Sequence, residues 1–213
     1  SQPYGITKVQ ADQLSDSNTA SIKICIADTG IDLNHQDLVS GNITGEVSNT
    51  LTIEADIGEW STDTYGHGTH MAGTIAAVGG NNLGTVGVNP GGHIKLHVVK
   101  IVENPGWWPF YGSDLIAAVE RCQVAGADII NMSIAGSQSS EAERVAMQAA
   151  YDAGILLVAA SGKGGSTAYS YPASYEPVIS AAATDSADEP WVFSHFNDQI
   201  ELSAPGVSVP SIT

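Results

Sequence analysis

The apolar positions of the chain fall into short continuous runs separated by amphipathic stretches. Six runs predict buried strands, at 22–27, 94–101, 127–132, 155–160, 178–183 and 200–203. Helical spacing predicts helices at 67–78, 113–125 and 139–153, with Ser113 capping the second, and an arm and an irregular surface are expected at 1–20 and 41–61. Near-continuous apolar strands that alternate with helices are typical of a parallel sheet covered on both faces. The pattern therefore predicts a single α/β domain over residues 1–213, three-layered around a mainly parallel sheet.

Composition narrows the possible partners and leaves the compartment open. Twenty-three acidic against seven basic residues give a net charge of −16, which argues against nucleic acid or an anionic membrane and suits divalent cations. No run approaches the roughly 20 apolar residues of a membrane-spanning helix. No basic-plus-apolar leader is present, so we expect any signal peptide to have been removed. Cys25 and Cys122 fall in a predicted strand and helix, where two buried thiols and one disulfide are both compatible with the sequence.

Several polar groups follow predicted strands directly. Asp28 ends the first strand, Ser133 follows the third, and Lys163 follows the fourth. Because sites in open parallel sheets gather at the carboxyl ends of strands, we expect these groups along one edge, with His67 joining them from its helix. Histidine titrates near neutrality and is a candidate general base. The structural alternatives are a core histidine at position 67 and a turn-capping aspartate at position 28.

Four motifs occur in a fixed order along the chain. The Asp-Thr-Gly at 28–30 alone is weak, since it also occurs in aspartic proteases, where two carboxylates share a proton. Here the aspartate of the one such motif is followed 39 positions later by the first histidine of Gly-His-Gly-Thr-His at 66–70. An Asn-Met-Ser at 131–133 and an Ala-Pro-Gly-Val at 204–207 come next. With these motifs the chain resembles the subtilisin-like serine proteases (subtilases), from about residue 2 to its last residue.

The resemblance implies a secreted, extracellular serine endopeptidase with a subtilisin-like fold. Asp28 would accept the Nδ1 hydrogen of His67, and His67 would take the proton of a serine hydroxyl and pass it to the leaving amine. The family's serine lies in a Gly-Thr-Ser-Met-Ala motif, and these 213 residues contain no Gly-Thr-Ser. We therefore expect the chain to be the larger fragment, completed by a companion C-terminal fragment that carries the serine. An inactive relative that binds peptides without cleaving them, and a hydrolase of another class, are the alternatives.

The same resemblance assigns an oxyanion position and a peptide-binding cleft. Lys163 stands where subtilases carry an oxyanion-binding asparagine; it would donate through its ammonium or be an ordinary surface lysine. Substrates would be peptides or proteins, added as an extended strand. The implied substrate-binding residues are Ser133, Ile134, Ala135, Gly136, Ala160 and Gly162. Because Ala160 and Gly162 are small, they would leave the first substrate side-chain pocket open to larger side chains. The aromatic stretch 105–112 would line the other side or pack on itself.

Calcium is the cofactor that the resemblance implies, in a structural role. Calcium prefers carboxylate, amide and carbonyl oxygens. The implied ligands are Gln2, Asp37, Val78, Asn82, Leu83 and Thr85. The loop is one residue longer than the common family form, which leaves the choice between Asn81 and Asn82 open. A loop without metal is the alternative.

Overall fold

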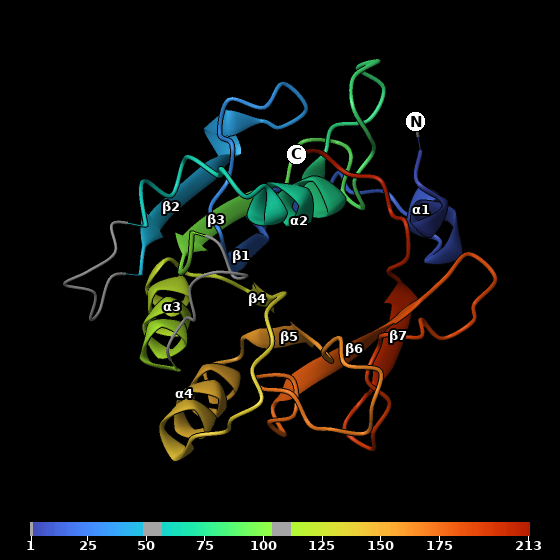
Figure 1. Cartoon of the computed structure of the whole chain (residues 1–213). Helices are drawn as coiled ribbons and strands as arrows, with labels where there is room; N and C mark the ends of the chain where they lie inside the picture. The colour runs from blue at the N-terminus through green and yellow to red at the C-terminus, as the bar shows by residue number, and fades with distance from the viewer. Residues whose placement is uncertain (1, 49–56, 104–111) are drawn as a thin grey trace.

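A computed structural model, which describes residues 2–48, 57–103 and 112–213, places a seven-stranded sheet between helices (Figure 1). The strands are β1 (Lys23–Asp28), β2 (Ile43–Val47), β3 (Lys95–Lys100), β4 (Ile129–Met132), β5 (Leu156–Ala160), β6 (Val178–Thr184) and β7 (Leu202–Pro205). The helices are α1 (Tyr4–Lys8), α2 (His67–Ala76), α3 (Gly112–Val124) and α4 (Glu141–Asp152), with short 3-10 turns at Ala11–Gln13, Thr19–Ser21 and Ser40–Asn42. The order is β2-β3-β1-β4-β5-β6-β7, and all neighbouring strands are parallel. The predicted fold class is confirmed.

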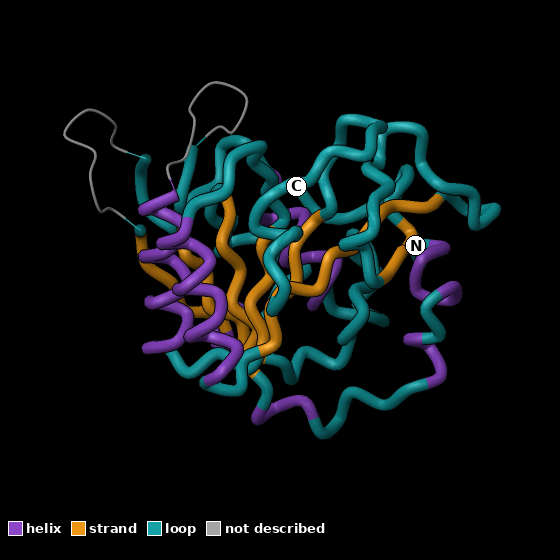
Figure 2. Tube along the Cα trace, turned by 90° about the horizontal axis from the view of Figure 1, so that it is seen from below, coloured by secondary structure: helices purple, strands orange, loops and turns teal. Residues whose placement is uncertain are grey.

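Helices flank the strands of the sheet (Figure 2), and an apolar cluster of buried side chains fills the space on each side of it. On one face α2 packs over β1 and β3, where Ile26 is fully buried. On the other face α3 and α4 supply Leu115 and Met147 against strand residues such as Ile130. Because the central strands are covered on both faces, their sequences are apolar at successive positions rather than alternating.

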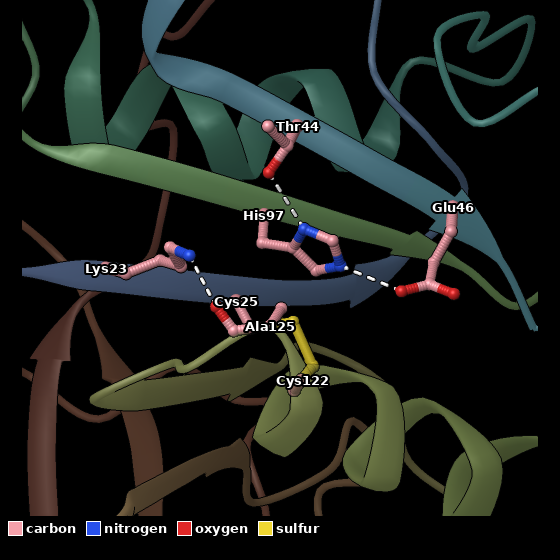
Figure 3. Close-up of a disulfide and its surroundings, with 7 residues drawn as sticks. All are labelled: Lys23, Cys25, Thr44, Glu46, His97, Cys122 and Ala125. Atoms are coloured by element: carbon pink, nitrogen blue, oxygen red, sulfur yellow. Dashed lines mark hydrogen bonds and ion pairs between the residues drawn. A yellow bond between two sulfur atoms is a disulfide. The ribbon is translucent and has the colours of Figure 1, made fainter.

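The edge strand β2 lies in the region that the sequence predicted to be irregular, so that prediction is wrong. Its sequence, Ile-Thr-Gly-Glu-Val, has little apolar character, and its polar side chains are held from neighbouring elements. His97 of β3 forms hydrogen bonds with Thr44 at 2.9 Å and Glu46 at 3.2 Å (Figure 3). Arg121 of α3 also pairs with Glu46. Tertiary contacts, rather than the local sequence, therefore stabilise β2 as a strand.

Element ends also differ from the prediction. Ser113 lies inside α3 and does not cap it, because Gly112 before it is already helical. In α4 the side chain of Ser140 caps the helix by accepting from the backbone N–H of Glu143 at 3.1 Å. The N-terminal arm contains two short helices, the α-helix at Tyr4–Lys8 and the 3-10 turn at Ala11–Gln13. The aromatic stretch 105–111 lies outside the described residues.

Cys25 and Cys122 form a disulfide that ties β1 to α3 (Figure 3). The two cysteines are 97 residues apart in the sequence, and both are fully buried. The structure thus selects the disulfide over two free thiols. A cross-link that closes so long a segment restricts the unfolded chain strongly.

Replacing both cysteines, Cys25→Ala with Cys122→Ala, should lower the free energy of unfolding by about 2–5 kcal/mol, because the unfolded chain regains its freedom. Urea unfolding followed by circular dichroism measures this loss. The wild-type protein unfolded in the presence of a reductant is the matched control and should approach the double variant. An equal midpoint for oxidised and reduced wild-type protein would contradict the disulfide.

Candidate active site

The site lies at β1, where successive strands of the chain change from one side of the sheet to the other. From the interior strand β1 the sheet extends through β3 to β2 on one side and through β4 to β7 on the other. Ile26 of β1 pairs with Val98 of β3 and with Asn131 of β4, so the carboxyl ends of these strands reach the same edge. In open parallel sheets, such a reversal is where ligands bind.

Asp28 and His67 meet at this edge, as predicted. The His67 Nδ1–H donates to Asp28 Oδ1 at 2.7 Å, and the same oxygen accepts from the backbone N–H of Thr29 at 2.7 Å. Asp28 is 1% exposed, whereas the His67 side chain is 34% exposed. With Nδ1 bound to the carboxylate, Nε2 is the basic nitrogen of the neutral ring. The pair therefore presents one accessible base of defined tautomer.

The surroundings of His67 make its imidazole more basic. Its hydrogen bond to Asp28 is the main cause that raises its pKa above the usual 6.5, and burial opposes this. The charges of Asp28 and Asp63 raise the pKa further, while the charge of Lys163 lowers it. The net shift is upward, so the ring holds its proton to higher pH than a free histidine does.

Two glycines let the turn after β1 approach the start of α2. Gly30 has φ +108°, and a Cβ there would lie 2.6 Å from the carbonyl oxygen of Thr62. A Cβ at Gly68 would lie 2.1 Å from the carbonyl oxygen of Gly30. A side chain at Gly68 would push the start of α2 away from the turn after β1, and one at Gly30 would collide with the backbone of residues 60–62. The short distance between Asp28 and His67 depends on both glycines.

Asp63 is a residue of this site that the sequence analysis missed. Its carboxylate accepts hydrogen bonds from the side chain of Thr29, the backbone N–H of Gly66, and both the N–H and hydroxyl of Thr69, at 2.7–2.9 Å. Burial alone would raise the pKa of Asp63, but these hydrogen bonds outweigh it and lower the pKa. The available signal was an aspartate just before a helix, whose first N–H groups need acceptors.

Lys163 lies in the loop that follows β5, at the same edge of the sheet. Its charge acts on His67, which places the two side chains within electrostatic reach. The loop is held by His195, whose backbone N–H donates to the Gly162 carbonyl at 3.3 Å. A Cβ on Gly164 would lie 2.5 Å from His195 Nε2. No sequence signal connects position 195 to this loop.

The predicted substrate-binding residues lie after the adjacent strands β4 and β5. Beyond β4, Gly136 forms an antiparallel bridge with Tyr171 through two 2.8 Å backbone hydrogen bonds. Ser133 is half-buried, Ile134 is buried and Ala135 is exposed. Ala160 ends β5, and Gly162 follows it with φ +104° and room for no Cβ, since one would lie 2.3 Å from Ser170 Oγ. The structure thus brings both predicted groups to neighbouring strand ends.

Asp37, one of the predicted calcium ligands, is a buried carboxylate enclosed by the loop after α2. Asp37 is 0% exposed; its Oδ1 accepts from the Asn81 side chain at 2.6 Å, and its Oδ2 accepts from the Thr85 N–H at 2.9 Å. A Cβ on Gly84 would lie 2.4 Å from Oδ2, so the loop encloses the carboxylate tightly. The surface pocket beside it is lined by Gln2, Gly80, Asn81, Asn82, Leu83, Gly84, Thr85 and Val86. Val78 is tied to the same segment through its N–H, which donates to the Asp37 carbonyl at 3.0 Å.

These oxygens match the preference of calcium for carboxylate, amide and carbonyl donors. The side chain found on Asp37 is that of Asn81, next to the predicted Asn82, which has φ 60° and lines the pocket. Within residues 2–48, 57–103 and 112–213 no three His, Cys, Asp or Glu side chains cluster as a metal site. A calcium ion would therefore be held by one carboxylate and neutral oxygens.

The serines near residue 213, all in the part of the chain that the structure describes, are not hydrogen-bonded to His67. Ser211 Oγ donates to the His70 carbonyl at 2.8 Å, on the helix turn after His67. Ser203 lies in β7. Within the described parts of the chain, His67 makes no hydrogen bond to a serine hydroxyl. The helices of those parts include none long and apolar enough to cross a bilayer.

Comparison with known proteins agrees with this geometry. The model of the subtilase family matches residues 19–212. The chain is 38% identical to subtilisin DY of Bacillus licheniformis, over 98% of this chain and 74% of that protein. It is 35% identical to subtilisin amylosacchariticus of Bacillus subtilis subsp. amylosacchariticus, over 99% and 54%. The crystal structure of the psychrophilic subtilisin-like protease Apa1 from the Antarctic psychrotroph Pseudoalteromonas sp. AS-11 superposes with a TM-score of 0.88 at 43% identity, over 99% of this chain and 47% of that one.

The chain thus spans between about half and three quarters of the length of these relatives. The match covers nearly all of its residues, and the relatives are subtilisins and a subtilisin-like protease. The chain belongs to the subtilase family of serine endopeptidases.

Proposed function

We propose that this protein cleaves peptide bonds as a secreted serine endopeptidase, with Asp28 and His67 as two members of its triad. The observation that carries the proposal is the 2.7 Å hydrogen bond between these residues at the carboxyl edge of a subtilase sheet. The third member would be a serine on a segment outside these 213 residues. Peptide and protein substrates would pair with the backbone of residues 133–135, because both backbone groups of Gly136 already bond Tyr171.

The proposed reaction moves one proton through His67. As the serine oxygen attacks the peptide carbonyl, His67 Nε2 takes the hydroxyl proton, and the resulting imidazolium is stabilised by Asp28. The same proton then passes to the nitrogen of the leaving amine, which leaves an acyl-enzyme. Water repeats the sequence in reverse and releases the acid. Asp28 remains ionised throughout and keeps the ring in one orientation.

Three features support a serine on a further segment. The relatives are longer than this chain. The strands at one end of the sheet remain partly uncovered: Leu202 of β7 is 58% exposed and the nearby Phe196 is 61% exposed. Finally, Asp28 Oδ2 is buried without a hydrogen-bond partner among the residues that the structure describes. Additional chain would cover apolar surface and could supply a donor.

Secretion is supported by the disulfide between Cys25 and Cys122. Disulfides persist in oxidising compartments and are rare where glutathione keeps thiols reduced. The strongly acidic composition also suits an extracellular protein that must stay soluble.

The purified protein with its serine-bearing segment should cleave an unfolded protein substrate with a rate that rises with pH. The base form of His67 is required, and the pKa of His67 is raised, so kcat/KM should reach half its maximum above pH 6.5. His67→Ala should lower kcat by about 100- to 10,000-fold or more. His93→Ala removes an exposed histidine and should leave the rate unchanged. Peptide binding without cleavage by wild-type protein, or equal rates for both variants, would contradict the proposal.

We further propose that Lys163 donates to the oxyanion that forms on the substrate carbonyl. It lies at the carboxyl edge of the sheet, within electrostatic reach of His67, on a loop that His195 holds in place. An ammonium is a compact charge with three donors on a flexible stem, so it would stabilise negative charge more by Coulomb attraction than by fixed geometry.

Lys163→Met should lower kcat with little change in KM, because the oxyanion exists only in the transition state and intermediates. The expected loss is about 100- to 1,000-fold, a range already known from a side-chain donor in a subtilisin rather than derived from this structure. In this variant the rising limb of the pH profile should also move to higher pH, because the Lys163 charge lowers the pKa of His67 in the wild type. Lys95→Met, at an exposed lysine, is the charge-matched control. An unchanged kcat in Lys163→Met would overturn this role.

We propose calcium as a structural cofactor at Asp37. The ion would be held by the Asp37 carboxylate, with side-chain amides of Gln2 and an asparagine at 81 or 82, and with carbonyl oxygens of Val78, Leu83 and Thr85. When bound, it would neutralise the buried carboxylate and join the N-terminal arm to the loop after α2. The support is the donor chemistry and the tight enclosure of Asp37 by Gly84.

A chelator should lower the melting temperature, and added calcium should restore it. Calcium at 100 times its dissociation constant stabilises a folded protein by about 2.7 kcal/mol. That corresponds to roughly 5–10 °C for a domain of this size. Scanning calorimetry measures the shift, and Asp37→Asn should abolish the response to calcium whereas the exposed control Asp152→Asn should keep it. The same calcium response in Asp37→Asn would show that the ion binds elsewhere.

A further inference from the structure

Asp63 contacts both segments that build the Asp28–His67 pair. Its Oδ1 accepts from Thr29 Oγ1 at 2.9 Å, in the turn after β1, and from the Gly66 N–H at 2.8 Å, just before α2. Its Oδ2 accepts from the Thr69 N–H at 2.8 Å and the Thr69 hydroxyl at 2.7 Å, in the first turn of α2. Four donors therefore converge on one half-buried carboxylate.

The two threonines extend this contact in both directions. Thr29 Oγ1, which donates to Asp63, accepts from the Gly68 N–H at 2.9 Å, and the Thr29 N–H donates to Asp28 Oδ1. Thr69 Oγ1 donates to Asp63 and accepts from the Asp32 N–H at 2.9 Å. Each hydroxyl thus has its hydrogen committed to Asp63. An acceptor-only, ionised carboxylate is the group that satisfies all four donors.

The segment that carries Asp63 is itself anchored on both sides. Lys100, fully buried at the end of β3, donates from Nζ to the Thr62 carbonyl at 2.9 Å and pairs with Glu103 at 2.5 Å. The Thr64 hydroxyl donates to the same Glu103 carboxylate. Asp63 is therefore presented from a fixed backbone rather than from a free loop.

We propose that Asp63 is a positioning residue for the Asp28–His67 pair, whose ionised carboxylate holds the turn after β1 against the first turn of α2. The effect of Asp63 on catalysis rests on the proposed function. Its effect on the geometry of Asp28 and His67 does not. Removing the charge should loosen the contact between the two segments and make His67 less basic.

The Tyr65 ring lies beside His67, with 6.5 Å between the ring centroids, and the other titratable groups that face His67 come from four places. Asp28 lies at the end of β1, Asp63 before α2, Lys163 after β5, and His70 one turn further along α2. The hydrogen bond and charge of Asp28 raise the pKa of His67 most, the charge of Asp63 adds to this, and the charge of Lys163 opposes it. Loss of the Asp63 charge therefore lowers the pKa of His67, while Asp28 remains in place.

The test is an NMR titration of His67 in the purified protein with isotope-labelled histidine. Asp63→Asn keeps the shape of the side chain but turns an NH₂ group toward donors. We expect a lower pKa of His67 and faster exchange of its Nδ1 proton than in the wild type. Glu120→Gln removes one exposed carboxylate from α3, on the opposite face of the sheet, and should match the wild type. A His67 titration and Nδ1 exchange rate in Asp63→Asn equal to those of Glu120→Gln would overturn the proposal.

Should Asp63→Asn fail to fold, Thr29→Val provides the second variant. It keeps the Asp63 charge and removes only the hydroxyl that joins Asp63 to Gly68. We expect faster exchange of the Gly68 amide and of the His67 Nδ1 proton, and unchanged exchange at both would overturn the proposal. Neither measurement needs a nucleophile. A protein that proves unable to cleave peptides would contradict the proposed function and leave this result standing.

In the complete enzyme, the misplacement caused by Asp63→Asn should lower kcat by about 100-fold, with KM nearly unchanged. The rising limb of the pH profile of this variant should move to lower pH, which a purely structural defect would not produce. An unchanged limb together with a reduced kcat would show that Asp63 acts only on folding.

Discussion

The hydrogen bond between Asp28 and His67 is the contact on which the rest of the site depends. It joins the end of β1, an interior strand of the sheet, to the first turn of a helix that begins 39 residues later. An imidazole held in this way has one tautomer and one accessible basic nitrogen. The bond forms only because the two segments approach at Gly30 and Gly68, where any side chain would collide with backbone. The chemistry of the pair therefore depends on a backbone geometry that these two glycines allow.

The charges around this contact are unevenly placed. The chain is strongly acidic overall, yet Lys100 is buried at the end of β3 and Lys163 follows β5, both at the edge that carries Asp28. Lys100 fixes the segment before α2 through Thr62 and Glu103. Lys163 instead acts on His67 through space. Lys100 is a structural cation, whereas Lys163 is the cation that we propose to stabilise the negative charge developing during acyl transfer.

The sequence predicted the sheet and the Asp28–His67 pair because both have strong local signals. Buried parallel strands are apolar throughout, and the two motifs stand in the family's order. It did not predict β2, whose Thr44 and Glu46 are held by His97 and Arg121. Asp63 and His195 were missed for the same reason: each acts on backbone groups or glycine surfaces that only the folded chain brings together.

The central claim is that Asp28 and His67 activate a serine supplied by a further segment. A serine-directed phosphonate followed by denaturing intact-mass analysis and peptide mapping tests it most directly. We predict one phosphonate adduct, on a serine outside residues 1–213 within a Gly-Thr-Ser-Met sequence, and none after His67→Ala. An adduct on a serine within these 213 residues, or no adduct on protein that still cleaves peptides, would contradict the account.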